Sequence, residues 1–487
     1  MPLLDRSRTT AATTRALAWV LVVTSTSGAW AGQEQLNLEV APDSAQQVST
    51  PLERAFEKVP GGAQLNAITD WTRKQLQDMP AFIRDTELKL KPRTYFFDQD
   101  KTTQSSSDPS DCISGDEQCA ATTHAKEQAW AIGGSIEYKS GWLFDHFRVG
   151  AEYFGSWPLY AGPNAGDTLL LSPSGGSYTV LGQAYAQLKF SDQVLTAGDS
   201  EYGTPYINRQ FNRMTPNTFE GVSLKGSFTG LRGKDFDYLV GYLSKIKQRN
   251  ATEFIPMSQV LGTADKYYGT YLAQFLFTAF GASVGLSEYY TPQNLNIFYA
   301  ESAWTPKVSD SYGLKLSVQY TAQRAVGSAS LTDLLQSVPL ASNVGARATF
   351  SYELSVLSLA YSLTAPQGAI VNPWGSSPSY TNGSIRNVNR PNEQAALLNY
   401  SYDFRKLSVP GLSAIGIFSY GWNAKDPTTS QRLPNQWELD LVADYRLPEG
   451  NFKGLWFRLQ RNQQQNTDGS SAIRQWRAIV YWETPLI

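Results

Sequence analysis

Residues 86–96 alternate between charged and apolar side chains in a way that few folds accept. A strand here would present Glu87, Lys89, Lys91, Arg93 and Tyr95 on one face, and Leu88, Leu90, Pro92, Thr94 and Phe96 on the other. Burying a row of charges in the core of a soluble sandwich is costly, because each charge loses its hydration. A water-filled lumen accepts such a row while the apolar face contacts lipid. The segment therefore predicts one strand of a transmembrane β-barrel.

The same period of two recurs along the rest of the chain. One such segment is a weak signal, but its repetition over about 400 residues indicates a barrel of about eighteen strands. We expect strands at 85–97, 128–139, 143–156, 177–190, 194–202, 219–229, 235–247, 267–277, 281–290, 295–304, 312–322, 345–353, 355–363, 395–404, 413–423, 436–445, 454–463 and 473–484. The connections between them alternate between short and long. The predicted fold is therefore all-β, a transmembrane antiparallel β-barrel with short periplasmic turns and long extracellular loops.

The N-terminal region departs from this pattern. Residues 1–31 combine three arginines, an apolar run and Ala-Trp-Ala at 29–31, which is typical of a secretory signal peptide. Beyond it, no stretch approaches the ~20 consecutive apolar residues of a membrane-spanning helix. We expect residues 32–84 to form a periplasmic extension with short helices, and residues 85–487 to form the barrel. The sequence leaves open whether the extension sits in the barrel mouth or is mobile.

The composition excludes several kinds of site. The chain has only two Cys and two His, too few for zinc clusters, haem attachment or most iron–sulfur centres, so no cofactor is expected. Cys112 and Cys119 are expected to form a disulfide in an oxidising periplasm, and a metal site that includes His124 is the alternative. The formal net charge of -2 lacks the basic footprint of a nucleic-acid binder.

Five stretches resemble one family of barrels. Residues 398–412 contain Tyr-Asp-Phe, a short spacer and Pro-Gly-Leu, and the similarity continues through residues 435–438 and 449–458. Residues 213–226, around Pro-Asn-Thr-Phe-Glu-Gly, and residues 91–98 at the first expected strand extend it towards the N-terminus. In this order and spacing, the stretches resemble the OprD family of outer-membrane porins.

The resemblance implies an eighteen-stranded pore in the outer membrane of a Gram-negative cell, narrowed by an inward-folded third loop. Members admit small solutes, often carboxylates such as amino acids and aromatic acids, past an interior column of basic residues. A row of cations in a narrow lumen concentrates and steers carboxylates. The expected partners are small-molecule solutes, outer-membrane lipids and lipopolysaccharide, without nucleic acid. The barrel is expected to be a monomer or a loose homotrimer.

The third long loop, residues 203–218, is the candidate constriction. Its only charges are positive, on Arg209 and Arg213, and these lie among polar residues that include Tyr206 and Asn208. If the loop folded inward, it would form a narrow constriction lined by positive charge. The resemblance to the OprD family favours this inward conformation. The alternative is a loop over the rim whose arginines are solvated.

Further candidates for the pore lining lie elsewhere in the chain. Arg458 falls on a rung of the family's basic column, and Gln460 is the next inward position. The remaining members of the expected set are Lys89, Lys91, Arg93, Lys245, Asp440 and Arg390. The basic residues among them are opposed by the carboxylates of Glu87, Glu137, Glu152, Asp440 and Asp444. The sequence therefore leaves the choice between anion and cation preference open.

Two other functions stay open at this stage. In the first, the chain is a receptor, adhesin or export barrel whose lumen is closed by residues 32–84 and whose loops bind a partner. In the second, it is an outer-membrane hydrolase that uses His146 beside Asp145. A hydrolytic triad needs a positioned nucleophile and oxyanion donors, and no Gly-x-Ser-x-Gly or similar context is present. We therefore do not expect an enzyme.

Overall fold

The computed structural model describes residues 72–106, 120–229, 235–262, 267–309, 311–327 and 340–487. The chain divides into two compact units, Met1–Leu38 and Glu39–Ile487, and every described residue belongs to the second. The expected signal peptide, residues 32–71 of the expected extension, and the cysteines Cys112 and Cys119 lie outside the described residues. None of the helices in these ranges is long and apolar enough to cross a bilayer.

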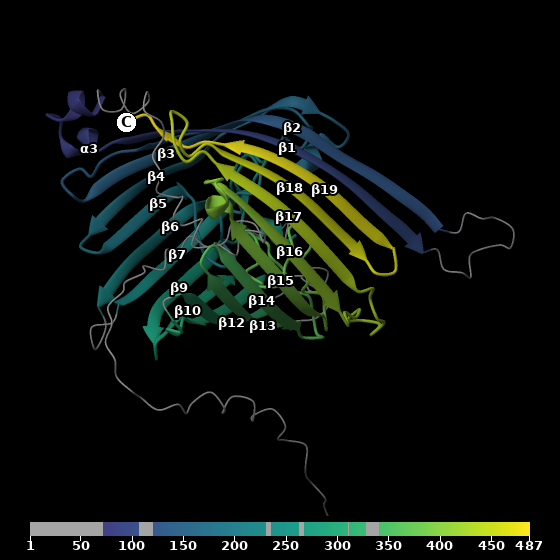
Figure 1. Cartoon of the computed structure of the whole chain (residues 1–487). Coiled ribbons are helices and arrows are strands. Elements are labelled where there is room, and N and C mark those ends of the chain that lie inside the picture. Colours follow the sequence, from purple (N-terminus) through teal and green to yellow (C-terminus); the bar gives the residue numbers. More distant parts are fainter. Residues whose placement is uncertain (1–71, 107–119, 230–234, 263–266, 310, 328–339) are drawn as a thin grey trace, which may run out of the picture. The chain divides into compact units, whose positions relative to one another are not determined.

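A single antiparallel sheet contains all the strands of the described ranges and closes on itself (Figure 1). The closing pair is β1 with β19, in register from Arg93 opposite Tyr481 to Thr103 opposite Ser471. Of the twenty strands described, β8 and β20 have two residues each, so eighteen strands build the wall. Because the sheet closes, every wall strand is paired on both edges. A barrel in a membrane requires this, since an unpaired edge in lipid would leave backbone groups without hydrogen bonds. The predicted eighteen-strand antiparallel barrel is confirmed.

The strand bounds follow the sequence expectation closely. The wall consists of β1 Glu87–Ser106, β2 Ala120–Lys139, β3 Phe147–Ala161, β4 Tyr178–Phe190, β5 Gln193–Ser200, β6 Thr218–Thr229, β7 Asp235–Lys247, β9 Thr270–Ala279, β10 Ala282–Thr291, β11 Leu295–Trp304, β12 Tyr312–Ala325, β13 Leu340–Tyr352, β14 Ser355–Thr364, β15 Gln394–Asp403, β16 Leu412–Trp422, β17 Gln436–Arg446, β18 Trp456–Asn466 and β19 Ser471–Tyr481. The short elements are α3 Ala81–Arg84, η3 Ala165–Thr168, β8 Ile255–Pro256, η4 Gln259–Leu261, η5 Phe404–Leu407 and β20 Thr484–Pro485. Residues 72–76, before α3, are also helical.

The two faces of the wall differ in the way that the alternation predicts. On β1, Arg93, Tyr95 and Phe97 face the lumen and are almost fully buried by the loops inside it. On β2, Trp130 and Ile132 point outward, where they are exposed in the isolated barrel and available to lipid. Polar side chains therefore line the inside of the wall, and apolar and aromatic ones cover the outside.

The ribbon of β1 and β2 is longer than expected and extends past the neighbouring strands (Figure 1). The expected strands at 85–97 and 128–139 left residues 98–127 as a long connection, and both ends of that stretch carry charged residues. These charges instead pair across the ribbon. Lys126 Nζ lies 3.3 Å from an Asp98 oxygen, and Lys101 forms an ion pair with Glu127. Cross-strand ion pairs of this kind stabilise a strand pair.

The connections define two rims. Turns at one rim are short, such as residues 191–192 between β4 and β5 and residues 353–354 between β13 and β14. The other rim carries the long connections, including the one of residues 365–393. We call them the short-turn rim and the long-loop rim. Their alternation is not strict, because residues 292–294 form a short connection at the long-loop rim.

The backbone at Gly134 generates a stability prediction. Gly134 lies in β2 with φ +130°, and an added Cβ atom would lie 2.0 Å from the Lys91 carbonyl oxygen. We expect Gly134→Ala to lower the free energy of unfolding by roughly 1–3 kcal/mol, the usual cost of such strain. Gly416→Ala in β16 is the matched control, because its added Cβ would have its nearest neighbour at 3.8 Å. Heat-dependent gel mobility of the refolded barrel measures the difference, and equal stability of the two variants would refute the prediction.

Candidate functional site

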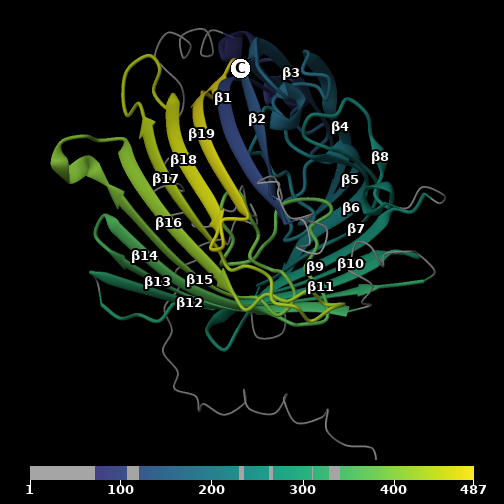
Figure 2. The same ribbon diagram turned by 90° about the vertical axis from the view of Figure 1, so that its right-hand side faces the viewer.

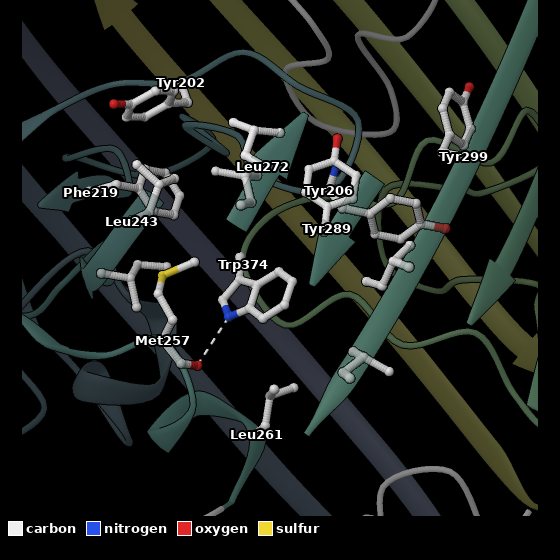
Figure 3. Close-up of a cluster of buried hydrophobic side chains, with 14 of the residues drawn as sticks. Tyr202, Tyr206, Phe219, Leu243, Met257, Leu261, Leu272, Tyr289, Tyr299 and Trp374 are labelled. Carbon is white, nitrogen blue, oxygen red and sulfur yellow. Dashed lines mark hydrogen bonds between the residues drawn. The ribbon is translucent and has the colours of Figure 1, made fainter. Parts of the chain in front are cut away.

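The connection between β5 and β6, residues 201–217 (loop 3), folds into the lumen (Figure 2). Tyr206 anchors it to a distant part of the wall. The Tyr206 hydroxyl donates to Thr321 Oγ1 of β12 at 2.9 Å, and its backbone N–H donates to the Tyr289 hydroxyl of β10 at 3.2 Å. The Tyr206 ring meets Tyr289 and Tyr299 edge to face, with centroids 5.9 and 6.2 Å away (Figure 3). Loop 3 is therefore fixed through Tyr206 to β10, β11 and β12.

A second long connection, residues 365–393 (loop 7), meets loop 3 inside the barrel. Ile207 pairs with Trp374 in a short parallel bridge, and Trp374 Nε1 donates to the Met257 carbonyl oxygen at 3.1 Å (Figure 3). Asn208 is fully buried. Its Oδ1 accepts the Ser376 N–H at 3.0 Å, and its Nδ2 donates to the Ser376 carbonyl at 3.1 Å. Asn208 thus clamps the two loops together, with no surface left to meet a solute.

The tip of loop 7 is held by two buried carboxylates of β17. Glu438 accepts the backbone N–H groups of Ile385 and Arg386 at 2.6 and 2.9 Å. Asp440 accepts the N–H of Ser384 at 3.0 Å. Glu438 and Asp440 are 3% and 0% exposed, so the loop covers them completely. Charge-assisted hydrogen bonds are stronger than neutral ones, and here they fix the position of loop 7.

Neighbouring strands add two more contacts to this tip. Arg477 of β19 donates through Nη2 to the Ser384 carbonyl at 3.3 Å. Gln460 of β18 donates through Nε2 to Ser384 Oγ at 3.1 Å. Gln460 faces the lumen and is buried there, where it holds the tip of loop 7.

Four arginines converge where loop 3 approaches β1 and β19: Arg93, Arg209, Arg213 and Arg477. Arg93 and Arg209 lie against the ring of Phe211, 4.4 and 4.8 Å from its centroid. Arg213 and Arg477 lie against Phe97, at 4.9 and 5.8 Å. Cation–π contacts of this kind hold guanidinium groups in place while leaving them charged. We call these four arginines with Phe97 and Phe211 the arginine cluster.

The members of the arginine cluster differ in their access to water. Arg93, Arg213 and Arg477 are buried, and Arg213 Nε donates to the Thr168 carbonyl at 2.8 Å, which ties loop 3 to the connection after β3. The Arg209 side chain is 39% exposed, and its Nε lies 3.5 Å from Glu201 Oε2. Arg209 is thus the member that reaches open space in the lumen.

Other expected pore-lining cations are paired with carboxylates. Lys91 Nζ lies 2.8 Å from Glu137 and 3.0 Å from Glu152. Arg458 makes two contacts of 2.8 Å with Asp444. Pairing of this kind cancels most of the field that a cation exerts on a passing solute.

Two more cations of the expected set have acidic neighbours. Arg390 Nη2 lies 2.6 Å from Glu393 at the end of loop 7. Lys89 Nζ lies 3.4 Å from Glu483, and its side chain is only partly exposed. The arginine cluster therefore has the largest concentration of positive charge near the loops.

Lys245 requires a correction to the alternation. Leu243 of β7 belongs to the buried cluster inside the barrel, but Ser244 forms a bulge, so Lys245 lies on the opposite face from Leu243. It sits opposite Glu220 of β6 and forms an ion pair with it at 2.8 Å. Both side chains are about two-fifths exposed, at 41% and 37%. The bulge therefore turns Lys245 to the outer face, where it does not line the pore.

The connection after β3, residues 162–177 (loop 2), was not expected to contribute. Leu170 and Leu171 are fully buried against Tyr95 and Phe97 of β1, together with Met214 of loop 3. The available signal was three consecutive leucines, 169–171, in an otherwise polar loop. An apolar run in a loop indicates that the loop is packed against something.

A closed barrel with loops packed inside its lumen defines a class of protein, the outer-membrane diffusion channels. Residues 80–486 match the family model described as outer membrane porin, OprD family. The chain belongs to this family, and the resemblance in the sequence is confirmed. It is an outer-membrane porin for the passive, selective diffusion of small solutes, and the family consists of porins. The alternative of a plugged receptor or export barrel is not favoured.

Solved porins have the same fold. The chain is similar to Pseudomonas aeruginosa OpdK with vanillate, at 19% identity and a TM-score of 0.68, over 83% of this chain and 100% of that one. It is similar to P. aeruginosa OccK9 (OpdG) at 22% identity and 0.68, with the same coverage. It is also similar to a BenF-like porin from Pseudomonas fluorescens Pf-5 at 15% identity and 0.68, again with that coverage. No curated protein matches the chain.

The Tyr206 anchor generates a prediction about channel noise. Tyr206→Phe loses a hydrogen bond worth about 1 kcal/mol, whereas Tyr206→Ala also loses buried aromatic packing worth roughly 3–5 kcal/mol. We expect Tyr206→Ala to loosen loop 3 and to give larger, noisier single-channel currents, with a weaker effect for Tyr206→Phe. Tyr320→Ala, on the outward face of β12, is the control. Quiet, unchanged currents in Tyr206→Ala would exclude the anchor role.

The carboxylates under loop 7 generate a second prediction. In Glu438→Gln, the amide keeps one acceptor but turns an NH2 group towards a backbone N–H, so the tip of loop 7 loses at least one hydrogen bond. We expect more frequent partial closures in planar-bilayer recordings. Glu353→Gln at the short-turn rim is the control, since Glu353 forms an exposed ion pair with Lys406. Identical gating in all three proteins would show that Glu438 does not position the loop.

Proposed function

We propose that this porin prefers small solutes that bear a carboxylate, aromatic acids among them. The observation that supports the proposal most directly is the arginine cluster, in which guanidinium groups from β1, β19 and loop 3 meet beside Phe97 and Phe211. A related porin, OpdK, was solved with vanillate, an aromatic carboxylate. The chemistry that would recognise such a solute is present in this chain.

Each part of the arginine cluster has a role in the proposal. A guanidinium group matches the two oxygens of a carboxylate, and the edge of the half-buried Phe211 ring would contact the aromatic part of the solute. In a narrow lumen, low-dielectric walls focus the field of the cations and raise the local concentration of anions. Arg209 is the member proposed to meet the solute, because its side chain is the most exposed. Arg93, Arg213 and Arg477 would supply the surrounding field.

Of the carboxylates near the loops, Glu201 offsets part of the charge of Arg209, from which it lies 3.5 Å away. Two others oppose this preference only weakly. Glu438 and Asp440 are covered by loop 7, and their oxygens already accept backbone N–H groups. A passing cation would have to displace these bonds to bind them. We therefore propose that the positive side of the constriction dominates selectivity.

We also propose roles for the N-terminal region, for the two cysteines and for the assembly of the barrel. Residues 1–31 would direct export and be removed, and residues 32–84 would lie on the periplasmic side of the barrel. A disulfide between Cys112 and Cys119 would close the tip of the β1–β2 ribbon. The barrel would act as a monomer or a loose homotrimer, with each lumen conducting separately.

Arg209→Gln tests the proposal. We expect it to lower the ratio of anion to cation permeability by about two- to tenfold, because it removes the exposed charge of the cluster. The matched control is the double variant Asp444→Asn with Arg458→Gln, which removes a neutral pair and should leave the ratio unchanged. Reversal potentials in a salt gradient, with benzoate as a blocker, measure both. An unchanged ratio and unchanged block in Arg209→Gln would contradict the proposal.

A further inference from the structure

Two arginines flank a tryptophan on the outer surface of the barrel. Arg461 of β18 stands opposite Trp476 of β19, with its guanidinium carbon 4.9 Å from the centre of the indole ring. Arg474 lies two residues before Trp476 on the same face of β19. Trp476 is 44% exposed, whereas the alternate residues Gln475 and Arg477 are buried in the lumen. Arg461, Trp476 and Arg474 therefore point away from the pore, and we call them the outer arginine patch.

The position of the patch along the strands sets its environment. Arg474 lies three residues inside the start of β19, at the long-loop rim. Trp437 and Tyr420 lie opposite each other near the same rim, as members of an aromatic girdle do. A lipid-facing arginine costs roughly 2–4 kcal/mol at the bilayer midplane but only about 0–1 near the interface. Arg461 and Trp476 lie at the middle of β18 and β19, level with the point on β1 where the outward residues change from Phe96 to Asp98. The patch thus lies where lipid headgroups begin.

The two acidic residues next to the patch, Asp98 and Asp100, lie close to the ammonium group of Lys126. Asp98 and Asp100 of β1 stand opposite Trp476 and Arg474. Lys126 Nζ of β2 lies 3.3 Å from Asp98 and 3.9 Å from Asp100, and Gln128 also donates to Asp98. Two carboxylates here face three cations, Lys126, Arg461 and Arg474, which leaves the patch with an excess of one positive charge. Diagonal neighbours on a sheet are about 7–8 Å apart, so both guanidinium groups can reach one phosphate.

We propose that the outer arginine patch binds the phosphate groups of lipid A, the glycolipid of the outer leaflet. Long loops of outer-membrane barrels face the cell exterior, so the long-loop rim lies in that leaflet. Guanidinium groups bind phosphate through paired, charge-assisted hydrogen bonds. The indole between them holds Arg461 in place and packs against the acyl chains. The site lies outside the pore and is independent of the proposed solute preference.

Native mass spectrometry of the purified barrel with added lipid A tests the site. We expect the double variant Arg461→Gln with Arg474→Gln to lose about tenfold in lipid A affinity, as expected for the loss of about 1.4 kcal/mol. Dephosphorylated lipid A should bind weakly and equally to wild type and variant. The control is Arg405→Gln with Lys406→Gln, which removes the same charge at the short-turn rim. Heat-dependent gel mobility verifies that each variant is folded.

Three outcomes would overturn the proposal. The first is wild-type affinity in the patch variant, and the second is equal binding of lipid A and its dephosphorylated form to wild type. In the third, the variant keeps lipid A but loses self-association, which would assign the patch to a contact with a second copy of the chain. Ion selectivity should be unchanged in the patch variant, so this test and that of the solute preference can fail separately.

Discussion

The pairing of β1 with β19 is the constraint on which the other features depend. Eleven residue pairs join these strands, from Arg93 with Tyr481 to Thr103 with Ser471. Without this pairing, two strand edges would be open to lipid, where an unpaired backbone group has no water to bind. The same pairing places Arg93 of β1 and Arg477 of β19 on one side of the lumen. Closure of the barrel therefore also brings together the two arginines of the cluster that belong to wall strands, Arg93 and Arg477.

The interior loops convert this wall into a selective path. Tyr206 fixes loop 3 to β10 and β12, and Asn208 fixes it to loop 7. The carboxylates of Glu438 and Asp440 then fix the tip of loop 7. Tyr206, Asn208 and Asp440, which the sequence offers as solute contacts, are therefore used to hold the loops. Selectivity is left to the groups that remain accessible, foremost Arg209.

The sequence predicted the wall better than the constriction, for a physical reason. Alternation is a local property, so eighteen strands follow from it. It fails where local rules change, as at the Ser244 bulge that turns Lys245 outward. The role of a loop residue depends on distant partners. Asn208 and Ser376 are 168 residues apart in the chain, and no local pattern links them. The arginines of residues 203–218 were recognised as candidates, but Phe211, whose ring contacts Arg209 and Arg93, was not.

The most direct measurement of the central claim is the reversal potential of the wild-type channel in a planar bilayer under a salt gradient. If the arginine cluster controls permeation, the reversal potential lies nearer the equilibrium potential of the anion than that of the cation. Benzoate then blocks the current more strongly than a cationic aromatic compound of similar size. A reversal potential nearer the equilibrium potential of the cation, with stronger block by the cationic compound, would contradict this account. It would assign the control of ion selectivity to the carboxylates of the pore.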